Sequence, residues 1–215
     1  MEFDTVIKAL PFLLEGLGIT LYVSAMGTLG GSVIGIIICV LRWTRVPVLV
    51  WLAAVYISYF RGVPLLVQLL LFYNFLPYAG IDLSPLVAAI CALGMVGGAY
   101  IAEILRGALA AIPKGQVEAG LALGFAPLSI WQRLLLPQML RLSMPAITNE
   151  LIMLVKASSL VSVVGLAEIT RVSQTFAAST YRPMEFYLAA GAFYLITNLT
   201  LSFCSSLLER KLARK

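Results

Sequence analysis

The sequence predicts an all-α integral membrane protein with five transmembrane helices, an outside N-terminus and a cytoplasmic C-terminus. Two observations support this fold class. Hydrophobic residues make up 61% of the 215 residues and charged residues only 12%, and the mean hydropathy is +0.98. A soluble domain is roughly 45–50% apolar and about 25% charged. The second observation is a series of apolar runs long enough for the roughly 20 residues that a helix needs to cross a bilayer.

We expect a single membrane domain over residues 1–215, with a cytoplasmic helical elbow between the third and fourth spans. A further short helix is expected in the connection 167–185. The predicted spans are 16–41, 47–76, 86–105, 144–166 and 186–208, and the polar segment that contains the elbow is 106–141.

The first span is the simplest, because no residue between Glu15 and Arg42 is charged. Within it, Gly27, Gly31 and Gly35 recur at every fourth position. Small residues at this spacing lie on one face of a helix and let a neighbouring helix approach closely. The sequence therefore predicts tight helix packing against this face.

The second and third spans contain charged residues. The run 47–76 is interrupted by Arg61-Gly62-Val63-Pro64, which predicts a kink that shapes a pathway, and Gln68 is a candidate to line it. Near the end of the third span, Glu103 and Arg106 are three residues apart. This spacing predicts a surface ion pair that fixes the helix end.

The orientation follows from the distribution of lysine and arginine. Five spans put the termini on opposite sides. With the N-terminus outside, only Lys8, Arg171 and Arg182 lie outside, whereas ten basic residues lie inside. The positive-inside rule therefore places segment 106–141 and the C-terminal tail in the cytoplasm. The ten are Arg42, Arg45, Arg106, Lys114, Arg133, Arg141, Arg210, Lys211, Arg214 and Lys215.

Several functions are excluded by composition. The chain has no histidine, the commonest metal ligand and general base. Cys39, Cys91 and Cys204 lie in separate apolar runs without metal-ligand spacing. We expect no metal site, and the net charge of +5 reflects membrane orientation rather than nucleic-acid binding.

The segment Lys114–Pro137, which we call the elbow, is too interrupted to cross a membrane. Its glycines and spread charges predict two short helices joined by a turn at Gly124-Phe125-Ala126. Pro127 suits the first position of the second helix. A membrane protein with such an elbow between its spans is expected to present it to a soluble partner.

The elbow has a fixed pattern. Three residues separate Glu118-Ala119-Gly120 from Gly124, and nine more precede Leu134-Leu135-Leu136-Pro137. The pattern resembles the cytoplasmic EAA loop of ABC-importer permeases, with Gly120 and Leu134 replacing alanine and isoleucine. In a docking helix, small residues allow close contact, Gly124 supports the turn, Glu118 offers a charge and Pro137 ends the second helix. The alternative is an interfacial amphipathic hairpin with no partner.

The flanking sequence resembles the polar amino acid permeases, the histidine/glutamine/arginine/glutamate branch of the ABC importers. The similar stretches are RGVPLLVQLLLFY (61–73), AYIAEILRGALAAIPKGQVEAG (99–120) and KASSLVSVVGL (156–166). The resemblance implies a multi-pass protein of the bacterial cytoplasmic (inner) membrane. It also implies a pair of permease subunits, identical or related, ATPase subunits docked through the elbow, and an extracytoplasmic amino-acid-binding protein.

The chain has no G-x-x-x-x-G-K-[ST] phosphate loop. It is therefore expected to hold no cofactor and to perform no catalysis of its own. ATP and Mg²⁺ would be bound by the partner ATPase subunit, so the energy for transport would come from another polypeptide.

The fourth span carries the candidate substrate residues, because ionisable groups inside a span indicate a functional site. Asn149 and Lys156 lie near one helix face, and the hydroxyls of Ser158 and Ser159 follow the lysine. A cation beside hydroxyls can hold an α-carboxylate. Glu150 lies about 120° from Lys156 on an ideal helix and could meet the substrate amine.

The resemblance adds one departure at this place. Polar amino acid permeases often carry K-[DN]-[ST]-S-L here, and Ala157 stands where an acidic or amide residue is common. Cargo and the contribution of this subunit to binding are therefore left open.

Three alternatives accompany this interpretation. Lys156 could instead pair with an acidic residue on a neighbouring helix and hold the bundle together. The protein could be an ion-coupled secondary transporter with Glu150 and Lys156 as the coupling pair, although no internal repeat supports it. It could also be a structural subunit of a larger membrane complex.

Overall fold

The computed structural model describes residues 4–44 and 46–213, and this part of the chain contains helices and no strand. Four of its helices are long and apolar enough to cross a membrane, or five if the bent pair α2–α3 is one span. The long helices are α1 (Asp4–Trp43), α2 (Pro47–Gly62), α3 (Leu65–Asn74), α4 (Pro85–Ala110), α7 (Leu136–Ala157) and α9 (Pro183–Ala213).

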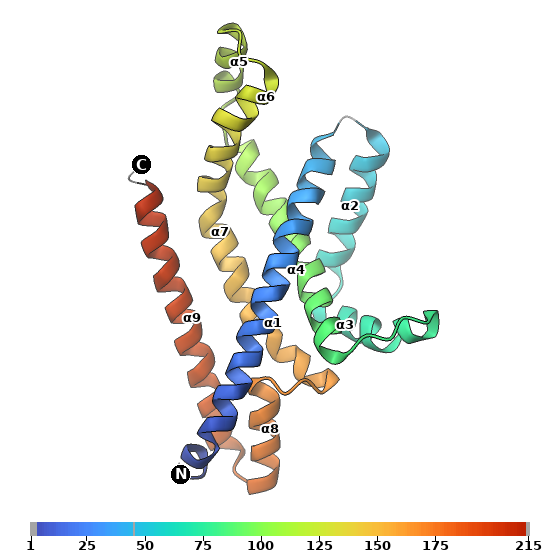
Figure 1. Cartoon of the computed structure of the whole chain (residues 1–215), viewed down its shortest axis with the longest axis vertical. Helices are drawn as coiled ribbons and strands as arrows, with labels where there is room; N and C mark the ends of the chain where they lie inside the picture. The colour runs from blue at the N-terminus through green and yellow to red at the C-terminus, as the bar shows by residue number, and fades with distance from the viewer. Residues whose placement is uncertain (1–3, 45, 214–215) are drawn as a thin grey trace.

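Helices α1, α2, α4, α7 and α9 run roughly along one axis, whereas α3 projects to the side (Figure 1). At one end project α5 (Lys114–Ala122) and α6 (Pro127–Ile130), together with the end of α9. At the opposite end lie the start of α1 and α8 (Ile169–Thr180). The short helix expected in the connection 167–185 is thus α8, and this prediction is confirmed.

The core of the fold is the contact between α1 and α4. A Cβ atom added to Gly31 would lie 3.0 Å from the carbonyl oxygen of Gly94 and 3.1 Å from the nitrogen of Gly98. One added to Gly35 would lie 2.7 Å from a side-chain carbon of Ile101. The predicted close packing of the α1 glycine face is therefore confirmed, and its partner is a second glycine-rich face on α4.

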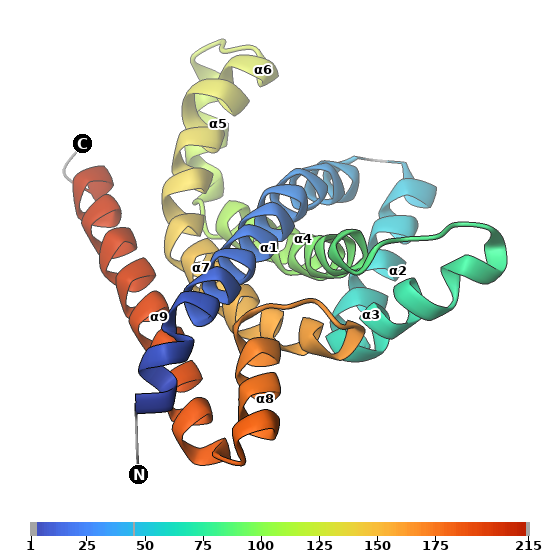
Figure 2. The same cartoon turned by 60° about the horizontal axis from the view of Figure 1, so that its bottom comes forward.

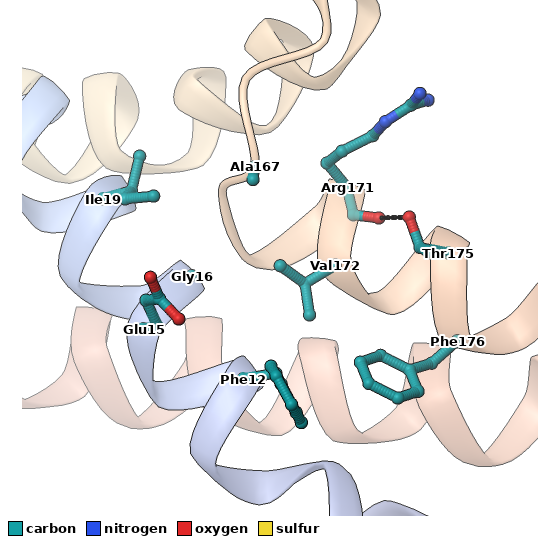
Figure 3. Close-up of a pocket in the computed structure, with 9 residues that line it drawn as sticks. All are labelled: Phe12, Glu15, Gly16, Ile19, Ala167, Arg171, Val172, Thr175 and Phe176. Carbon is teal, nitrogen blue, oxygen red and sulfur yellow. Dashed lines mark hydrogen bonds between the residues drawn. The ribbon is translucent and has the colours of Figure 1, made fainter.

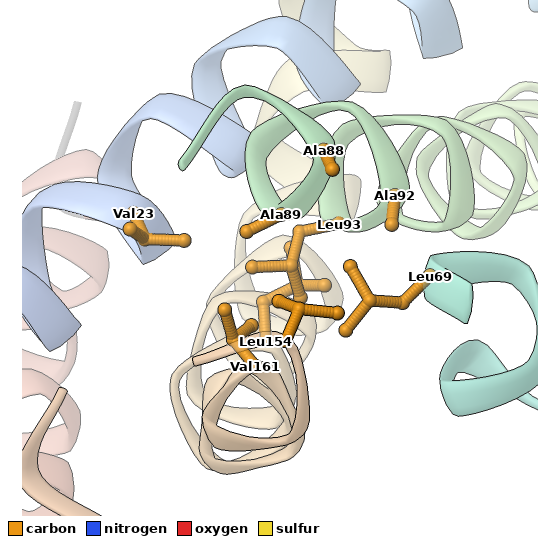
Figure 4. Packing of buried hydrophobic residues seen from close by; sticks show 9 residues of the cluster. Val23, Leu69, Ala88, Ala89, Ala92, Leu93, Leu154 and Val161 are labelled. Atoms are coloured by element: carbon orange, nitrogen blue, oxygen red, sulfur yellow. The ribbon is translucent and has the colours of Figure 1, made fainter. Parts of the chain in front are cut away.

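A hydrophobic cluster extends this contact to α3 and α7 (Figure 4). Leu93 of α4 lies among side chains from α1, α3 and α7, and the small side chains of Ala88, Ala89 and Ala92 allow these helices to approach α4. The other buried members are Val23, Leu69, Leu154, Val161 and Val164.

The second predicted span breaks where expected but bends more sharply than a kink. Helices α2 and α3 meet at 104°, so α3 turns to the side of the bundle (Figure 2). Val63 has φ −98° and ψ 135°, the extended conformation that a following proline imposes. Two extended residues, Val63 and Pro64, therefore separate the helices. The predicted kink would instead have been a smaller bend within one continuous helix.

The prediction that Pro137 ends the second elbow helix is wrong. Pro137 is the second residue of α7, directly after a π-helical turn, and the helix continues through it. A π-helical turn over 131–135 joins α6 to α7, and the N–H of Leu136 reaches the carbonyl of Trp131. The second elbow helix and the fourth span, predicted to start at 144, thus form one helical rod.

The rod ends in a 3₁₀ segment, Ser158–Val164, and then in Gly165 at φ +84°. Glu168 starts α8 as its N-cap: its carboxylate accepts hydrogen bonds from the N–H groups of Thr170 and Arg171 and from the hydroxyl of Tyr194. Burial raises the pKa of the Glu168 carboxyl, and these donors offset part of the shift.

The glycine contact gives a direct stability test. Gly31→Val is expected to lower the free energy of unfolding by about 1–3 kcal/mol, because the new side chain meets the α4 backbone rather than a movable side chain. The measurement is the thermal unfolding midpoint in detergent. The control is Gly30→Val, since a Cβ atom there meets nothing within 4 Å. Equal midpoints for the two variants would contradict the role given to this contact.

Candidate functional site

The elbow forms the turn that the sequence predicts. Gly124 adopts φ +79°, which glycine tolerates best, and closes the end of α5. The N–H of Phe125 donates to the carbonyl of Gly120 over 3.0 Å, and Pro127 occupies the first turn of α6. The two helices and the position of Pro127 are therefore confirmed.

The tip of the elbow exposes large apolar side chains. Leu123 is 77% exposed and Leu128 is 67% exposed, and Leu121 and Phe125 lie exposed beside them. Glu118 and Ala119 are exposed as well. An apolar patch of this kind on a segment between spans is typical of a protein-binding surface.

Gly120 serves the elbow itself. A Cβ atom there would lie 3.2 Å from the side chain of Ile130, so the glycine allows α6 to pack on α5. Beside it is a groove of about 330 Å³. Its lining residues are Gln116, Ala119, Gly120, Leu123, Phe125, Ser129, Ile130, Arg133 and Leu134.

The base of the elbow is anchored in the bundle. The amide of Gln138 on α7 donates to the Gln116 side chain on α5 over 2.7 Å. Trp43 at the end of α1 contacts Trp131 edge to face, with ring centroids 5.9 Å apart. The base of the elbow is therefore in contact with α1, α4 and α7. The buried residues that join them are Cys39, Ile101, Leu105, Ala108, Leu109, Ile112, Ile130, Leu135 and Met139.

Close to this base, Glu103 of α4 interacts with three arginines, and we call these four residues the Glu103 cluster. The sequence predicted only the pair with Arg106, whose guanidinium binds both carboxylate oxygens at 2.8–3.1 Å. The structure adds Arg42 of α1 at 2.5 Å and Arg61 of α2 at 3.9 Å. The pair is therefore part of a cluster that joins three helices.

A cavity of about 530 Å³, which we call the central cavity, lies where α2, α3, α4 and α7 meet. It contains both signs of charge, Arg61 and Glu150. The ion pairs between described residues all involve Glu103, so Glu150 has no ion-pair partner among the described residues. The other lining residues are Phe60, Gly62, Val63, Pro64, Leu65, Val96, Tyr100, Met153, Leu154 and Ala157.

The candidate substrate residues of the fourth span divide between the cavity and the surface. Glu150 lines the central cavity, whereas Asn149 and Lys156 are exposed on α7 and do not line it. Lys156 has no ion pair within the described chain, so the alternative in which it holds the bundle through a neighbouring acid is not observed. The hydroxyls of Ser158 and Ser159 donate to the carbonyls of Val155 and Lys156. The chain alone does not bring the lysine and the serines into one site.

Gln68 is buried outside the cavity. Its amide nitrogen donates to the carbonyls of Val63 at 2.7 Å and Phe60 at 3.2 Å, across the break between α2 and α3. These two carbonyls lose their helical partners at the break. Gln68 therefore fixes the bend and, with it, the position of Arg61.

Arg61 is the cavity residue that sequence reasoning did not assign to a site. The signal was a charge inside the apolar run 47–76, which is costly in a membrane and indicates function. It was interpreted there only as part of a kink.

A second groove, of about 260 Å³, lies between α1 and α8 at the end opposite the elbow. Glu15 and Arg171 line it, but their side chains do not converge, and Arg171 extends away from Glu15 (Figure 3). The rings of Phe12 and Phe176 lie 5.5 Å apart across its apolar part. Over residues 4–44 and 46–213, no group of three or more acidic, cysteine or histidine side chains could hold a metal.

The chain combines membrane-spanning helices, an elbow with an exposed apolar tip and a cavity that contains charged residues. This combination is typical of the permease subunits of transporters. The family described as binding-protein-dependent transport system inner membrane component matches residues 31–214. The chain belongs to this family and is an integral protein of the bacterial inner membrane.

Similar proteins cover the whole chain. The arginine transport system permease protein ArtQ of Bacillus subtilis is 38% identical over 99% of this chain and 97% of its own length. The glutamine transport system permease protein GlnP of Escherichia coli K12 is 40% identical, with 99% of each chain covered.

Two solved structures share the fold. A crystal structure of an amino acid ABC transporter with histidines has a TM-score of 0.94 and 34% identity, and the match covers 98% of this chain and 99% of that chain. An inward-facing methionine transporter, MetNI, has a TM-score of 0.81 and 25% identity, covering 95% of this chain and 98% of its own.

The role of Gln68 can be separated from ligand binding. Gln68→Met is expected to lower the free energy of unfolding by about 1–3 kcal/mol, because two carbonyls at the bend lose their donor. The control is Asn74→Met on the same helix, whose amide donates to the Leu70 carbonyl at an exposed site. Chemical unfolding in detergent measures both. A Gln68 variant as stable as the Asn74 variant would show that Gln68 does not fix the bend.

Proposed function

We propose that this chain is the permease subunit of an ATP-driven importer that carries a polar amino acid delivered by an external binding protein. The central cavity is the observation that carries the proposal, because it holds one cationic and one anionic side chain between the spans. The cargo class is supported by relatives named as arginine, glutamine and octopine permeases.

The charges of the cavity suit the common part of all free amino acids. A guanidinium such as that of Arg61 can bind a carboxylate through two parallel hydrogen bonds. Glu150, which has no ion-pair partner among the described residues, can accept hydrogen bonds from the α-ammonium group. Ala157 lines the cavity at the position where similar permeases often carry an acidic or amide residue, so it leaves space for the cargo side chain.

A second permease subunit, identical or related, would complete the pathway. Asn149, Met153 and Lys156 share an exposed face of α7, next to cavity-lining residues. A polar face with a lysine is unsuited to lipid, so it suits a subunit interface or an aqueous pathway. Only 6% of the most apolar part of α9 is buried in the chain, which leaves α9 for contact with lipid or the second subunit. Lys156 and Ser159 would then contribute to cargo binding from this side, whereas Ser158 is buried.

The elbow is the docking site for the ATPase subunit. Its exposed Leu121, Leu123, Phe125 and Leu128 supply apolar contact area, and Glu118 supplies a charge at the same tip. ATP and Mg²⁺ are bound by that subunit, since this chain has no phosphate loop. Nucleotide-driven movement of the ATPase would move the elbow and, through its base, the helices around the cavity.

The elbow end faces the cytoplasm, and the start of α1 faces outside. The positive-inside rule supports this orientation, because most of the lysines and arginines belong to segments at the elbow end. They include Arg42, Arg106, Lys114, Arg133 and Arg141. Part of the charge count cannot be placed: Arg45, Arg214 and Lys215 lie outside the described residues, as do the side chains of Arg210 and Lys211.

The docking role of the elbow can be tested by a substitution in its turn. Gly124→Ala is expected to weaken association with the ATPase subunit, because a side chain at φ +79° costs about 1–2 kcal/mol, or roughly fivefold to thirtyfold in affinity. The control is Gly107→Ala at the exposed end of α4, where a Cβ atom meets nothing within 4 Å. Co-purification and titration of the complex measure the effect. Association equal to that of the control would show that the turn is not needed for docking.

The cavity is tested by transport. Arg61→Gln and Glu150→Gln are each expected to lower uptake of the cargo by about tenfold or more, which corresponds to a lost charged hydrogen bond of about 1.5–3 kcal/mol. Uptake of radiolabelled L-arginine and L-glutamine is measured in proteoliposomes with the ATPase, ATP and the cognate binding protein. The matched control is Arg171→Gln, an exposed arginine outside the cavity.

Two results would overturn the proposed function. Uptake driven by an ion gradient in liposomes without any ATPase would favour the secondary transporter with Glu150 and Lys156 as the coupling pair. An absence of uptake under every condition, with an intact complex, would favour a structural subunit.

A further inference from the structure

The Glu103 cluster and the central cavity share one residue, Arg61. Its guanidinium lies 3.9 Å from a carboxylate oxygen of Glu103 and 5.0 Å from the ring centre of Tyr100. The same side chain lines the cavity that contains Glu150. A single cation therefore stands between the site proposed for the cargo and the charged group next to the base of the elbow.

The three arginines do not hold Glu103 equally. Arg42 lies at 2.5 Å, and Arg106 makes a two-pronged contact with both oxygens, whereas Arg61 is the most distant of the three. The Arg61 side chain is 42% exposed, while Glu103 is 18% exposed. Since Glu103 keeps two close partners without it, Arg61 is the member of the cluster that can leave at least cost.

We propose that Glu103 is a positioning residue that competes with the carboxylate of the cargo for Arg61. In the empty permease, Glu103 and the Tyr100 ring hold Arg61 at the side of the cavity nearer the elbow. A bound amino acid takes the guanidinium from Glu103. This proposal rests on the assignment of the cavity as the cargo site.

The exchange has a consequence for coupling. When Arg61 moves to the cargo, the charge of Glu103 is shared by Arg42 and Arg106 alone, and both contacts become stronger. Arg42 lies in the last turn of α1, and Arg106 lies in the last two turns of α4 before the elbow. Occupancy of the cavity therefore changes how firmly α1 is tied to α4 beside the base of the elbow, without contact between cargo and elbow.

The proposal makes predictions of opposite sign. Glu103→Gln removes the competitor, so the cargo is expected to bind about twofold to fivefold more tightly, the range that a partly exposed ion pair supports. Arg42→Gln and Arg106→Gln each leave Glu103 with one fewer close partner, so it retains Arg61 more strongly. These two variants are expected to bind the cargo more weakly, by a similar factor.

The experiment measures direct binding to the permease–ATPase complex in nanodiscs, without the external binding protein, which has its own site. The probe is radiolabelled L-arginine or L-glutamine, whichever binds the wild-type complex, and its α-amide is the control ligand. The amide has no carboxylate for Arg61, so Glu103→Gln should not tighten its binding. Size-exclusion chromatography confirms that each complex is intact.

The outcomes separate this proposal from the assignment of the cavity. If Arg61→Gln binds the amino acid as well as wild type does, the cavity is not the cargo site. If Arg61→Gln abolishes binding but Glu103→Gln weakens it or leaves it unchanged, the competition is refuted. If the Glu103→Gln complex does not assemble, the Arg42→Gln and Arg106→Gln variants test the competition instead. Unchanged or tighter binding of the amino acid in both variants would refute the competition.

Discussion

The rest of the structure depends on the backbone contact between α1 and α4. In a bilayer, apolar side chains gain little by leaving lipid for another helix, so association relies on close packing. Gly31 and Gly35 on one helix, with Gly94 and Gly98 on the other, bring the two backbones together. This approach places Arg42, at the end of α1, beside Glu103 of α4. The same contact makes α4 the helix on which α3 and α7 pack.

Charge is the second constraint, because ionisable groups are costly within a membrane unless they are paired or face water. The chain meets it in two ways. Glu103 is surrounded by arginines, which leaves that cluster with an excess of positive charge. Glu150 has no such partner in the part of the chain that the structure describes, and it lies in a cavity instead. The surplus of positive charge around Glu103 and the carboxylate of Glu150 are the two charges on which the proposed binding of an amino acid rests.

Much of the fold could be predicted from the sequence. Long apolar runs, the glycine spacing in α1 and the Gly124–Pro127 turn are local signals, and local geometry decides their outcome. The angle at Val63-Pro64 and the role of Pro137 could not be predicted, since a proline is compatible with both a helix end and a helix start. In the structure, the π turn at 131–135 joins α6 to α7, so the helix continues through Pro137 and does not end there.

The site was harder to predict than the fold. Lys156, Ser158 and Ser159 follow one another in sequence, but hydroxyls in a 3₁₀ segment bond to their own backbone, as both serines do here. Arg61 and Glu150 belong to different helices that are far apart in the sequence, so only tertiary packing brings them to one cavity. The elbow is encoded by one continuous stretch of sequence and could be predicted, whereas the cavity is formed by residues of several helices.

The continuous helical segment from Pro127 to Ala157 connects the elbow directly to the helix that lines the cavity. Its longer part, α7, carries Glu150. Glu150 lies 15 residues beyond Leu135 in the sequence and so about 22 Å further along the helix axis. Over a helix of that length, which contains Pro145 in its interior, a tilt of about 10° moves the carboxylate through roughly 4 Å, more than a hydrogen bond can stretch. In the proposed transport cycle, the ATPase therefore need not reshape the binding pocket, because a tilt of this one helix is enough to withdraw the acidic group from the cargo.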